Sequence, residues 1–417
     1  MEIKRDVYLE KLIRKQKNGL IKVVTGVRRC GKSYLLFKIF HNYLVESGVG
    51  ENHIIEVALD DRRNKELRDP DKMLEYIDGK IIDNEMYYII LDEVQLLPEF
   101  EDVLNSLLHI RNADVYVTGS NSKFLSTDVI TEFRGRGDEI RVYPLTFSEM
   151  LSVYDGAIEN AWDEYINYGG LPLVLSQSTW EEKAHYLTSL FGKVYLSDII
   201  DRHKIRNEEE MGELVDILSS AVGSLTNPIK LSKTFQSVKN KTISNNTLKK
   251  YMDYLQDAFL ISKAVRYDIK GKRYIGSPAK YYFEDIGLRN ARLGFRQTEE
   301  THLMENIIYN ELRYRGFQVD VGILELYGKD GNGKTTKKQV EVDFVANLGS
   351  RRYYIQSAFA LTNEEKIKQE TRSLKGIDDS FKKIIVVKDR IKARHDNNGF
   401  VTMGIFEFLT NPNSLEL

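Results

Sequence analysis

The segment of residues 26–33, GVRRCGKS, most constrains what this chain can fold into. It fits the phosphate-loop pattern of a glycine, four other residues and then Gly-Lys-Ser/Thr. Such a loop needs a buried strand before it and a helix after it, because backbone N–H groups and the helix N-terminus together bind phosphate oxygens. The apolar run LIKVVTG precedes the segment, and SYLLFKIFHNYLVES, with apolar residues at helical spacing, follows it. The order predicts a nucleotide-binding α/β domain.

A second segment, GKDGNGKT at residues 328–335, fits the same pattern. It lies between FQVDVGILELY and TKKQVEVDFVAN, which both have the composition of strands. A glycine-rich segment between two strands is typical of a hairpin tip, where no helix N-terminus faces an anion. We therefore expect a hairpin here and no nucleotide.

The first segment predicts a site for ATP and Mg²⁺. Its amides would contact the phosphates, Lys32 would reach the outer phosphates, and the Ser33 hydroxyl would bind Mg²⁺. Cys30 is interpreted as a small loop residue and not a nucleophile, because no histidine lies near it in sequence. The candidate nucleotide-binding residues are Gly26, Val27, Arg28, Arg29, Cys30, Gly31, Lys32, Ser33 and Tyr34.

Two acidic residues follow the apolar run in MYYIILDEVQLLPEF. Ligands of open parallel sheets bind at the carboxyl ends of strands, which is where Asp92 and Glu93 are expected. Asp92 is positioned to hold Mg²⁺, and Glu93 to orient or deprotonate the attacking water. The alternative is a pair of solvated carboxylates that cap the next helix.

Further polar candidates follow the strand ADVYVTGSNS. Among its last residues Asn121 is the first choice to contact the γ-phosphate or the water, because its amide both donates and accepts; a helix cap is the alternative. Arg134 and Arg136 precede a strand at 139–143. Either could act as an arginine finger, within the chain or from a neighbouring subunit, or be an ordinary surface arginine.

Length and composition restrict the class of protein. The 417 residues suggest two to four domains, and strands that alternate with helices over the first 150 residues predict a parallel sheet. The 60 Lys and Arg residues balance 62 Asp and Glu, which gives no global argument for nucleic-acid binding. A single cysteine, no signal-like N-terminus and no apolar run near the ~20 residues of a membrane span predict a cytoplasmic protein without a membrane partner.

GVRRCGKS, IILDEVQ, VTGSNSKFL, the RGR…EIRVYPLTFSEML stretch and YGGLPLVL occur together in this order. In this the chain resembles bacterial and archaeal AAA-type ATPases that carry a C-terminal restriction-endonuclease-like domain. The resemblance implies ATP binding with Mg²⁺ and hydrolysis, with Asp92 and Glu93 as the metal and water residues and a sensor near Asn121. GGLPLVL resembles the Gly-x-Pro element of related signalling ATPases, which places Pro172 against the nucleotide; a turn between helices is the alternative.

The middle of the chain predicts a winged helix-turn-helix. Three helical patterns lie between residues 210 and 261, and strands ISKAVRYD and AKYYFED surround a basic loop. The module could contact DNA phosphates or serve as a packing lid and protein contact. Its candidate DNA contacts are Lys239, Lys241, Lys249, Lys250, Lys270 and Lys272.

The last part of the chain resembles the PD-(D/E)XK nuclease fold. A helix carries Glu305, the strand EVDFVAN carries Asp343, and the next strand has Gln356. Ala358 occupies the position where an active nuclease needs a lysine, so we expect a binding fold that lacks metal-dependent cleavage. The predicted domains are the AAA-type ATPase core at 1–150, a helical lid or connector at 151–208, the winged helix at 209–295 and the nuclease-like α/β domain at 296–417.

Three functions are compatible with these features. The first is an ATP-driven switch whose winged-helix and C-terminal domains report the nucleotide state to a protein partner or to another copy of the chain. The second is a DNA-processing ATPase with an active nuclease. The third is a nucleotide-regulated binding protein without significant turnover.

Overall fold

The computed structural model describes residues 3–119, 135–239, 241–296, 299–329, 335–360 and 364–417. It separates into two compact units. The first consists of Met1–Pro144 together with Leu171–Leu173 and Asp257–Phe259, and the second contains the rest of the chain.

The first unit is built on a five-stranded parallel sheet, as the alternation of strands and helices predicts. The strand order is β2-β3-β4-β1-β5, and every neighbouring pair is parallel. The strands are β1 (Ile21–Gly26), β2 (Ile54–Ala58), β3 (Tyr87–Asp92), β4 (Ala113–Gly119) and β5 (Gly137–Val142).

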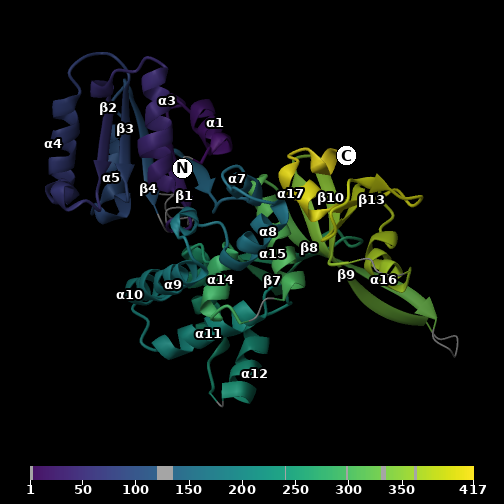
Figure 1. Ribbon diagram of the computed structural model, residues 1–417. Coiled ribbons are helices and arrows are strands. Elements are labelled where there is room, and N and C mark those ends of the chain that lie inside the picture. Colours follow the sequence, from purple (N-terminus) through teal and green to yellow (C-terminus); the bar gives the residue numbers. More distant parts are fainter. Residues whose placement is uncertain (1–2, 120–134, 240, 297–298, 330–334, 361–363) are drawn as a thin grey trace. The chain divides into compact units, whose positions relative to one another are not determined.

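Helices cover both faces of this sheet, which explains the continuous apolar runs of its strands. On one face, α4 (Pro70–Lys80) and α5 (Phe100–Leu107) pack on side chains such as Ile89 (Figure 1). On the other face lies a helical run at residues 32–46, made of α2 (Lys32–Tyr34), a π-helical segment (Leu35–Phe40) and α3 (His41–Glu46). The Phe40 ring of this run has its centroid 4.7 Å from that of Tyr116.

The sheet order brings three strand ends together. β1 lies between β4 and β5, and β4 separates β1 from β3. Because the strands are parallel, the carboxyl ends of β1, β4 and β3 meet at one edge, where open α/β sheets bind ligands. The phosphate-loop segment leaves the end of β1, and Asp92 is the last residue of β3.

The second unit contains helices and a mixed sheet. The helices are α7 (Phe147–Leu151), α8 (Ile158–Tyr168), α9 (Trp180–Leu190), α10 (Ser197–His203), α11 (Glu208–Ser220), α12 (Pro228–Lys239), α13 (Asn245–Asp257), α14 (Ile286–Arg292), α15 (Glu300–Tyr314), α16 (Glu364–Lys375) and α17 (Ile405–Thr410). Three of these helices, α11, α12 and α13, match the three helical patterns expected between residues 210 and 261.

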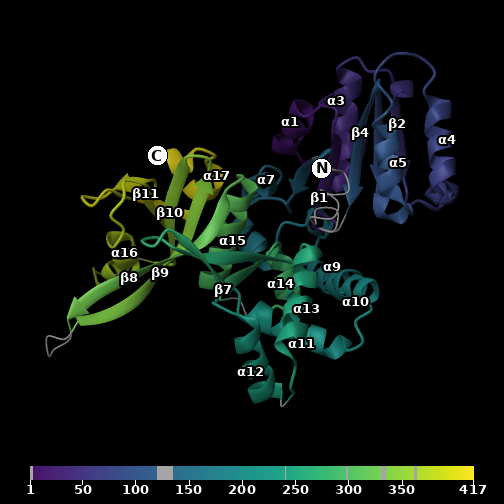
Figure 2. The same ribbon diagram turned by 180° about the vertical axis from the view of Figure 1, so that it is seen from behind.

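The mixed sheet has eight strands in the order β12-β13-β11-β10-β9-β8-β6-β7. The longest pair is β8–β9, antiparallel up to Lys329 opposite Thr335, and it extends as a ribbon beyond the other strands (Figure 2). The hairpin predicted around residues 328–335 is confirmed. The strands are β6 (Ile261–Asp268), β7 (Arg273–Phe283), β8 (Gln318–Lys329), β9 (Thr335–Leu348), β10 (Arg351–Ala358), β11 (Lys382–Val387), β12 (Arg394–His395) and β13 (Phe400–Gly404).

The two strands predicted as a wing are part of this larger sheet. β6 and β7 pair antiparallel, as a wing requires. β6 also pairs parallel with β8 through Arg266 and Val321. The sheet therefore crosses the expected boundary near residue 295, and the four-domain division remains a prediction.

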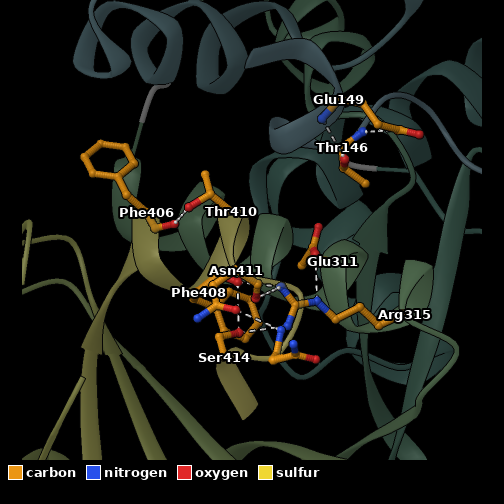
Figure 3. Close-up of polar contacts among 10 residues, drawn as sticks. Thr146, Glu149, Glu311, Arg315, Phe406, Phe408, Thr410, Asn411 and Ser414 are labelled. Carbon is orange, nitrogen blue, oxygen red and sulfur yellow. Dashed lines mark hydrogen bonds and ion pairs between the residues drawn. The ribbon is translucent and has the colours of Figure 1, made fainter. Parts of the chain in front are cut away.

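An arginine fixes the C-terminal helix of the second unit. Arg315 at the end of α15 donates from Nε to Glu311 at 2.7 Å and from Nη1 to Ser414 Oγ at 2.8 Å (Figure 3). Elsewhere in the same view Thr146 and Glu149 form a capping box that starts α7. The Arg315–Ser414 contact joins the last residues of the chain to the body of the second unit.

Candidate functional site

The loop after β1 needs glycine at two positions. Gly26 has φ +136°, and a Cβ added there would lie 1.9 Å from the carbonyl oxygen of Val142 in β5. Gly31 has φ +98° and directly precedes the helical run at 32–46. The backbone therefore turns tightly against β5 and presents the N-terminus of a helix at its end, as anion binding requires.

Lys32 is buried at the first position of that helix. Its ammonium donates to the carbonyl oxygens of Gly26 at 3.0 Å and Val27 at 3.2 Å. The cation is thus held within the loop. A phosphate oxygen is a stronger acceptor than a peptide carbonyl, because an ionised acceptor makes shorter and stronger hydrogen bonds.

Three oxygen-bearing side chains meet beside Lys32. The buried Asp92 carboxylate accepts hydrogen bonds from the hydroxyls of Thr118 and Ser33. Burial raises the pKa of Asp92, while these two hydrogen bonds oppose the rise. Hard cations prefer carboxylate and hydroxyl oxygens, so Ser33 and Asp92 fit the donor set of a Mg²⁺ site.

Glu93 follows in a left-handed backbone conformation, with φ 52° and ψ 47°. Its N–H donates to Thr118 Oγ1 at 2.9 Å, and its carboxylate accepts from the amide of Gln95. Such a conformation costs a non-glycine residue of order 1 kcal/mol or more and is often found at functional sites. Thr118 therefore fixes both acidic residues, a role that the sequence did not reveal.

Pro172 is close to the loop. Its Cγ lies 3.9 Å from the position that a Cβ on Gly31 would take. Both residues belong to the first unit. This proximity supports the prediction that the Gly-Leu-Pro turn borders the nucleotide.

The other loop residues differ in exposure. Val27 and Cys30 are buried, and the Cys30 Sγ lies 3.5 Å from the carbonyl oxygen of Val142. Burial raises the pKa of the Cys30 thiol, which keeps it protonated and supports its interpretation as a packing residue. Arg29 is exposed with φ 67°, and Tyr34 is 46% exposed; Arg28 is half-buried.

Comparison with known proteins assigns the family. A family model described as "AAA domain" matches residues 18–151, and one described as a domain of unknown function (DUF8612) matches residues 159–299. An uncharacterized protein of Haemophilus influenzae is 33% identical over 390 residues, which cover 92% of this chain and 93% of that protein. The chain belongs to this family of AAA-domain proteins. An uncharacterized protein of Methanocaldococcus jannaschii is 28% identical over 410 residues, 93% of this chain and 85% of that protein.

Solved structures match this chain only at low similarity. The Orc1 protein of Aeropyrum pernix, solved with DNA, has a TM-score of 0.28 and 11% identity, covering 70% of this chain and 92% of that chain. AMPPCP-bound DnaA of Aquifex aeolicus has a TM-score of 0.27 and 13% identity, covering 60% and 85%. At this similarity they carry no conclusion about function. The AAA-type P-loop domain rests on the family match.

Three predicted residues of the AAA domain are not placed in its site. Asn121 and Arg134 lie outside the described residues. Arg136 precedes β5, and its carbonyl accepts from the N–H of Ile21 at 2.9 Å. Ile21 is the first residue of β1, whereas the loop follows the last one. The backbone of Arg136 therefore lies at the edge of the sheet opposite the loop of its own chain, and its role as an arginine finger remains a prediction.

A second group of charged residues lies in the second unit. The ammonium of Lys280 in β7 is 2.6 Å from Glu341 Oε1, 2.9 Å from Glu305 Oε1 and 3.6 Å from Asp343 Oδ1. Burial alone lowers the pKa of Lys280, but the carboxylates, Glu305 most, raise it above its usual value. Burial and then Glu305 raise the pKa of Asp343. Glu305 and Asp343 were predicted from the sequence but Lys280 was not, because its only signal there is a lysine beside the apolar run YYF.

Two observations concern the described residues as a whole. No helix within the described ranges has the length and apolar character needed to cross a lipid bilayer. In the same ranges no group of three or more His, Cys, Asp or Glu side chains is arranged to hold a metal ion. Ser33 and Asp92 would therefore need phosphate oxygens and water to complete a Mg²⁺ shell, which is how Mg²⁺ binds in most nucleotide sites.

Proposed function

We propose that the AAA domain binds ATP with Mg²⁺ at residues 26–33 and hydrolyses it. The observation that carries this proposal is the convergence of Ser33, Asp92 and Thr118 beside the loop that ends in Lys32. In this proposal the loop amides and the Lys32 ammonium bind the phosphates. Ser33 and Asp92 hold Mg²⁺, which supplies charge stabilisation to the phosphoryl group when bound.

Glu93 is the residue proposed to act on water. It adjoins the metal-binding Asp92, and its backbone is held by Thr118. A carboxylate in this place can accept a proton from the attacking water. Asn121 as a contact to the γ-phosphate, and Arg134 or Arg136 as a finger in a neighbouring subunit, complete the proposal as predictions from the sequence.

The test is a Glu93→Gln variant of the full chain. We expect it to bind ATP normally and to release phosphate at least about 100-fold more slowly, since a positioned base contributes about 10²–10⁴-fold. Glu99→Gln is a matched control, because Glu99 is an exposed glutamate with the same φ of 52°. Equal phosphate release by Glu93→Gln and the wild type would leave only the third hypothesis, nucleotide binding without turnover, or a different base.

We further propose that nucleotide state is passed along the chain through the Gly-Gly-Leu-Pro turn. Leu171–Leu173 belong to the first unit, whereas the residues on both sides belong to the second. Pro172 lies near the loop, and two residues earlier the N–H of Gly170 donates to the buried Asp285 at 2.8 Å. A displacement of Pro172 by nucleotide would therefore pull on Asp285, which caps α14 through the N–H of Leu288 at 3.0 Å.

DNA contact through the predicted winged helix is a second candidate function. Lys249, Lys250, Lys270 and Lys272 are exposed, as phosphate contacts must be. Lys241 is instead paired with Glu209 at 2.9 Å and lies 3.5 Å from Glu213, which reduces its value as a contact. If DNA binds here, replacing Lys249 and Lys250 by alanine should weaken binding and reduce its salt dependence; unchanged binding would exclude this surface.

A further inference from the structure

The carboxylates around Lys280 come from two different elements. Glu341 and Asp343 are two residues apart in β9, so they lie on the same face of the sheet, and Glu305 comes from α15. Lys280 is 4% exposed and Glu305 and Asp343 are 8% exposed. Several like charges at such close range and such burial are stabilised by a cation among them.

That cation is the Lys280 ammonium, and two of its three distances are those of hydrogen bonds. The contacts to Glu341 and Glu305, at 2.6 and 2.9 Å, fit charge-assisted N–H···O bonds. Magnesium–oxygen bonds are about 2.0–2.1 Å, whereas these carboxylates are spaced around an ammonium.

The carboxylates are also held by other donors. The Tyr282 hydroxyl donates to the same Glu305 oxygen at 2.7 Å. The N–H of Ser357 in β10 donates to Asp343 Oδ2 at 2.9 Å. These bonds fix two carboxylates toward Lys280 from β7 and β10, so the ammonium is part of a built site and not a surface ion pair.

The neighbouring strand β10 has no cation at the position where the nuclease resemblance predicts a lysine. Ala358 occupies the position at which an active nuclease would have lysine. It is 1% exposed and packs in an apolar cluster with Tyr354 and Val345. Gln356 has a buried Oε1 for which the described part of the structure contains no hydrogen-bond donor. The positive charge of this site therefore comes from β7, which precedes α15 in the chain.

We propose that Lys280 is a built-in cation that occupies the carboxylate cluster of Glu305, Glu341 and Asp343 in place of a divalent metal ion. In this proposal the Lys280 ammonium blocks metal binding at the three carboxylates. The eight-stranded sheet is then a binding fold and not a metal-dependent nuclease. Removing the ammonium leaves a carboxylate cluster that takes up a divalent cation. This inference does not depend on ATP binding or hydrolysis.

The test measures Mn²⁺ binding by calorimetry without nucleotide, in full-length chains that also carry Asp92→Asn to remove the proposed metal ligand of the AAA domain. With Lys280 present we expect no Mn²⁺ at the cluster. Lys280→Met should bind one Mn²⁺ at least about 10-fold more tightly than the parent, and adding Asp343→Asn should abolish this gain. Lys263→Met, at an exposed lysine of β6, is the control and should resemble the parent.

Two results would overturn the proposal. One is Mn²⁺ binding by the parent chain that Asp343→Asn removes, and the other is a folded Lys280→Met chain that gains no Mn²⁺. If Lys280→Met does not fold, the unmodified chain decides the matter through incubation of plasmid DNA with Mn²⁺. Intact plasmid supports the proposal, whereas cleavage that Asp343→Asn abolishes contradicts it.

Discussion

Residues 26–33 and 328–335 share one glycine–lysine pattern but join different kinds of element. The first segment connects β1 to a helical run, and Gly31 places the start of that helix at the strand end. The second connects antiparallel strands β8 and β9, which remain paired up to Lys329 and Thr335. The pattern alone therefore does not make a phosphate site, because a helix N-terminus must also follow the loop and face the anion.

The two segments also differ in their neighbours. Beside the first lie Asp92 and Thr118, from strands far along the chain, and Pro172. The paired ends of β8 and β9 extend away from the rest of their sheet in both views (Figures 1 and 2). Among the described residues, the proposed metal ligand Asp92 thus lies beside the first segment. Three comparisons of variants can break or sharpen this difference.

The largest expected effect is on nucleotide affinity. Lys32→Ala removes the ammonium that the loop holds, and we expect ATP affinity to fall at least about 1,000-fold, or about 4 kcal/mol. Lys334→Ala, at the corresponding position of the second segment, should leave the affinity unchanged. Calorimetric titration of both variants checks this, and loss of binding in Lys334→Ala alone would reverse the assignment of the two segments.

A smaller effect is expected from the glycine that opens each segment. Gly26→Ala puts a Cβ 1.9 Å from the Val142 carbonyl oxygen at a φ of +136°, so we expect the unfolding free energy to fall by about 3–4 kcal/mol. Gly328 lies within β8, where alanine is tolerated and a change below about 1 kcal/mol is expected. Denaturant unfolding measures both, and equal losses would show that the first loop is not tightly packed against β5.

The smallest effect concerns Asp285, which accepts a hydrogen bond from Gly170 in the turn beside the first segment. Burial raises the pKa of Asp285 to about 6, against about 3.9 in an unfolded chain. Because the folded pKa is the higher one, the folded state binds the extra proton between these values. Stability should therefore fall by about 2–3 kcal/mol as the pH rises from about 4 to about 6, and stay level above that.

Asp285→Asn should remove this step from the pH dependence of the unfolding free energy. Gly170, Gly287 and Leu288 donate backbone hydrogen bonds to the carboxylate, and an asparagine oxygen can accept part of them. An unchanged step in the variant would show that another group titrates in this range.

The sequence predicted what depends on local order along the chain. The apolar run before residue 26 and the helical pattern after residue 33 predicted the phosphate loop. The residues DE after YYIIL predicted where β3 ends. The register of the parallel strands brings these segments together, and the sheet order agrees with the prediction of a nucleotide-binding domain.

What the sequence did not predict depends on contacts between distant residues. Thr118 reaches Asp92 only because β4 lies between β1 and β3. Lys280 reaches Glu341 across the eight-stranded sheet, and no spacing rule links residues 61 positions apart. The glycine-rich surroundings of Arg136 suggest a loop near phosphate, whereas the strand pairing puts it at the amino end of β1.

The most direct test of the account is an experimental structure of the full chain with Mg²⁺ and adenylyl imidodiphosphate. We expect the terminal phosphate at the amides of residues 26–33, with the Lys32 ammonium moved from the Gly26 and Val27 carbonyls to phosphate oxygen, and Mg²⁺ between Ser33 and Asp92. An analogue bound elsewhere, with Lys32 still on its own loop carbonyls, would contradict it.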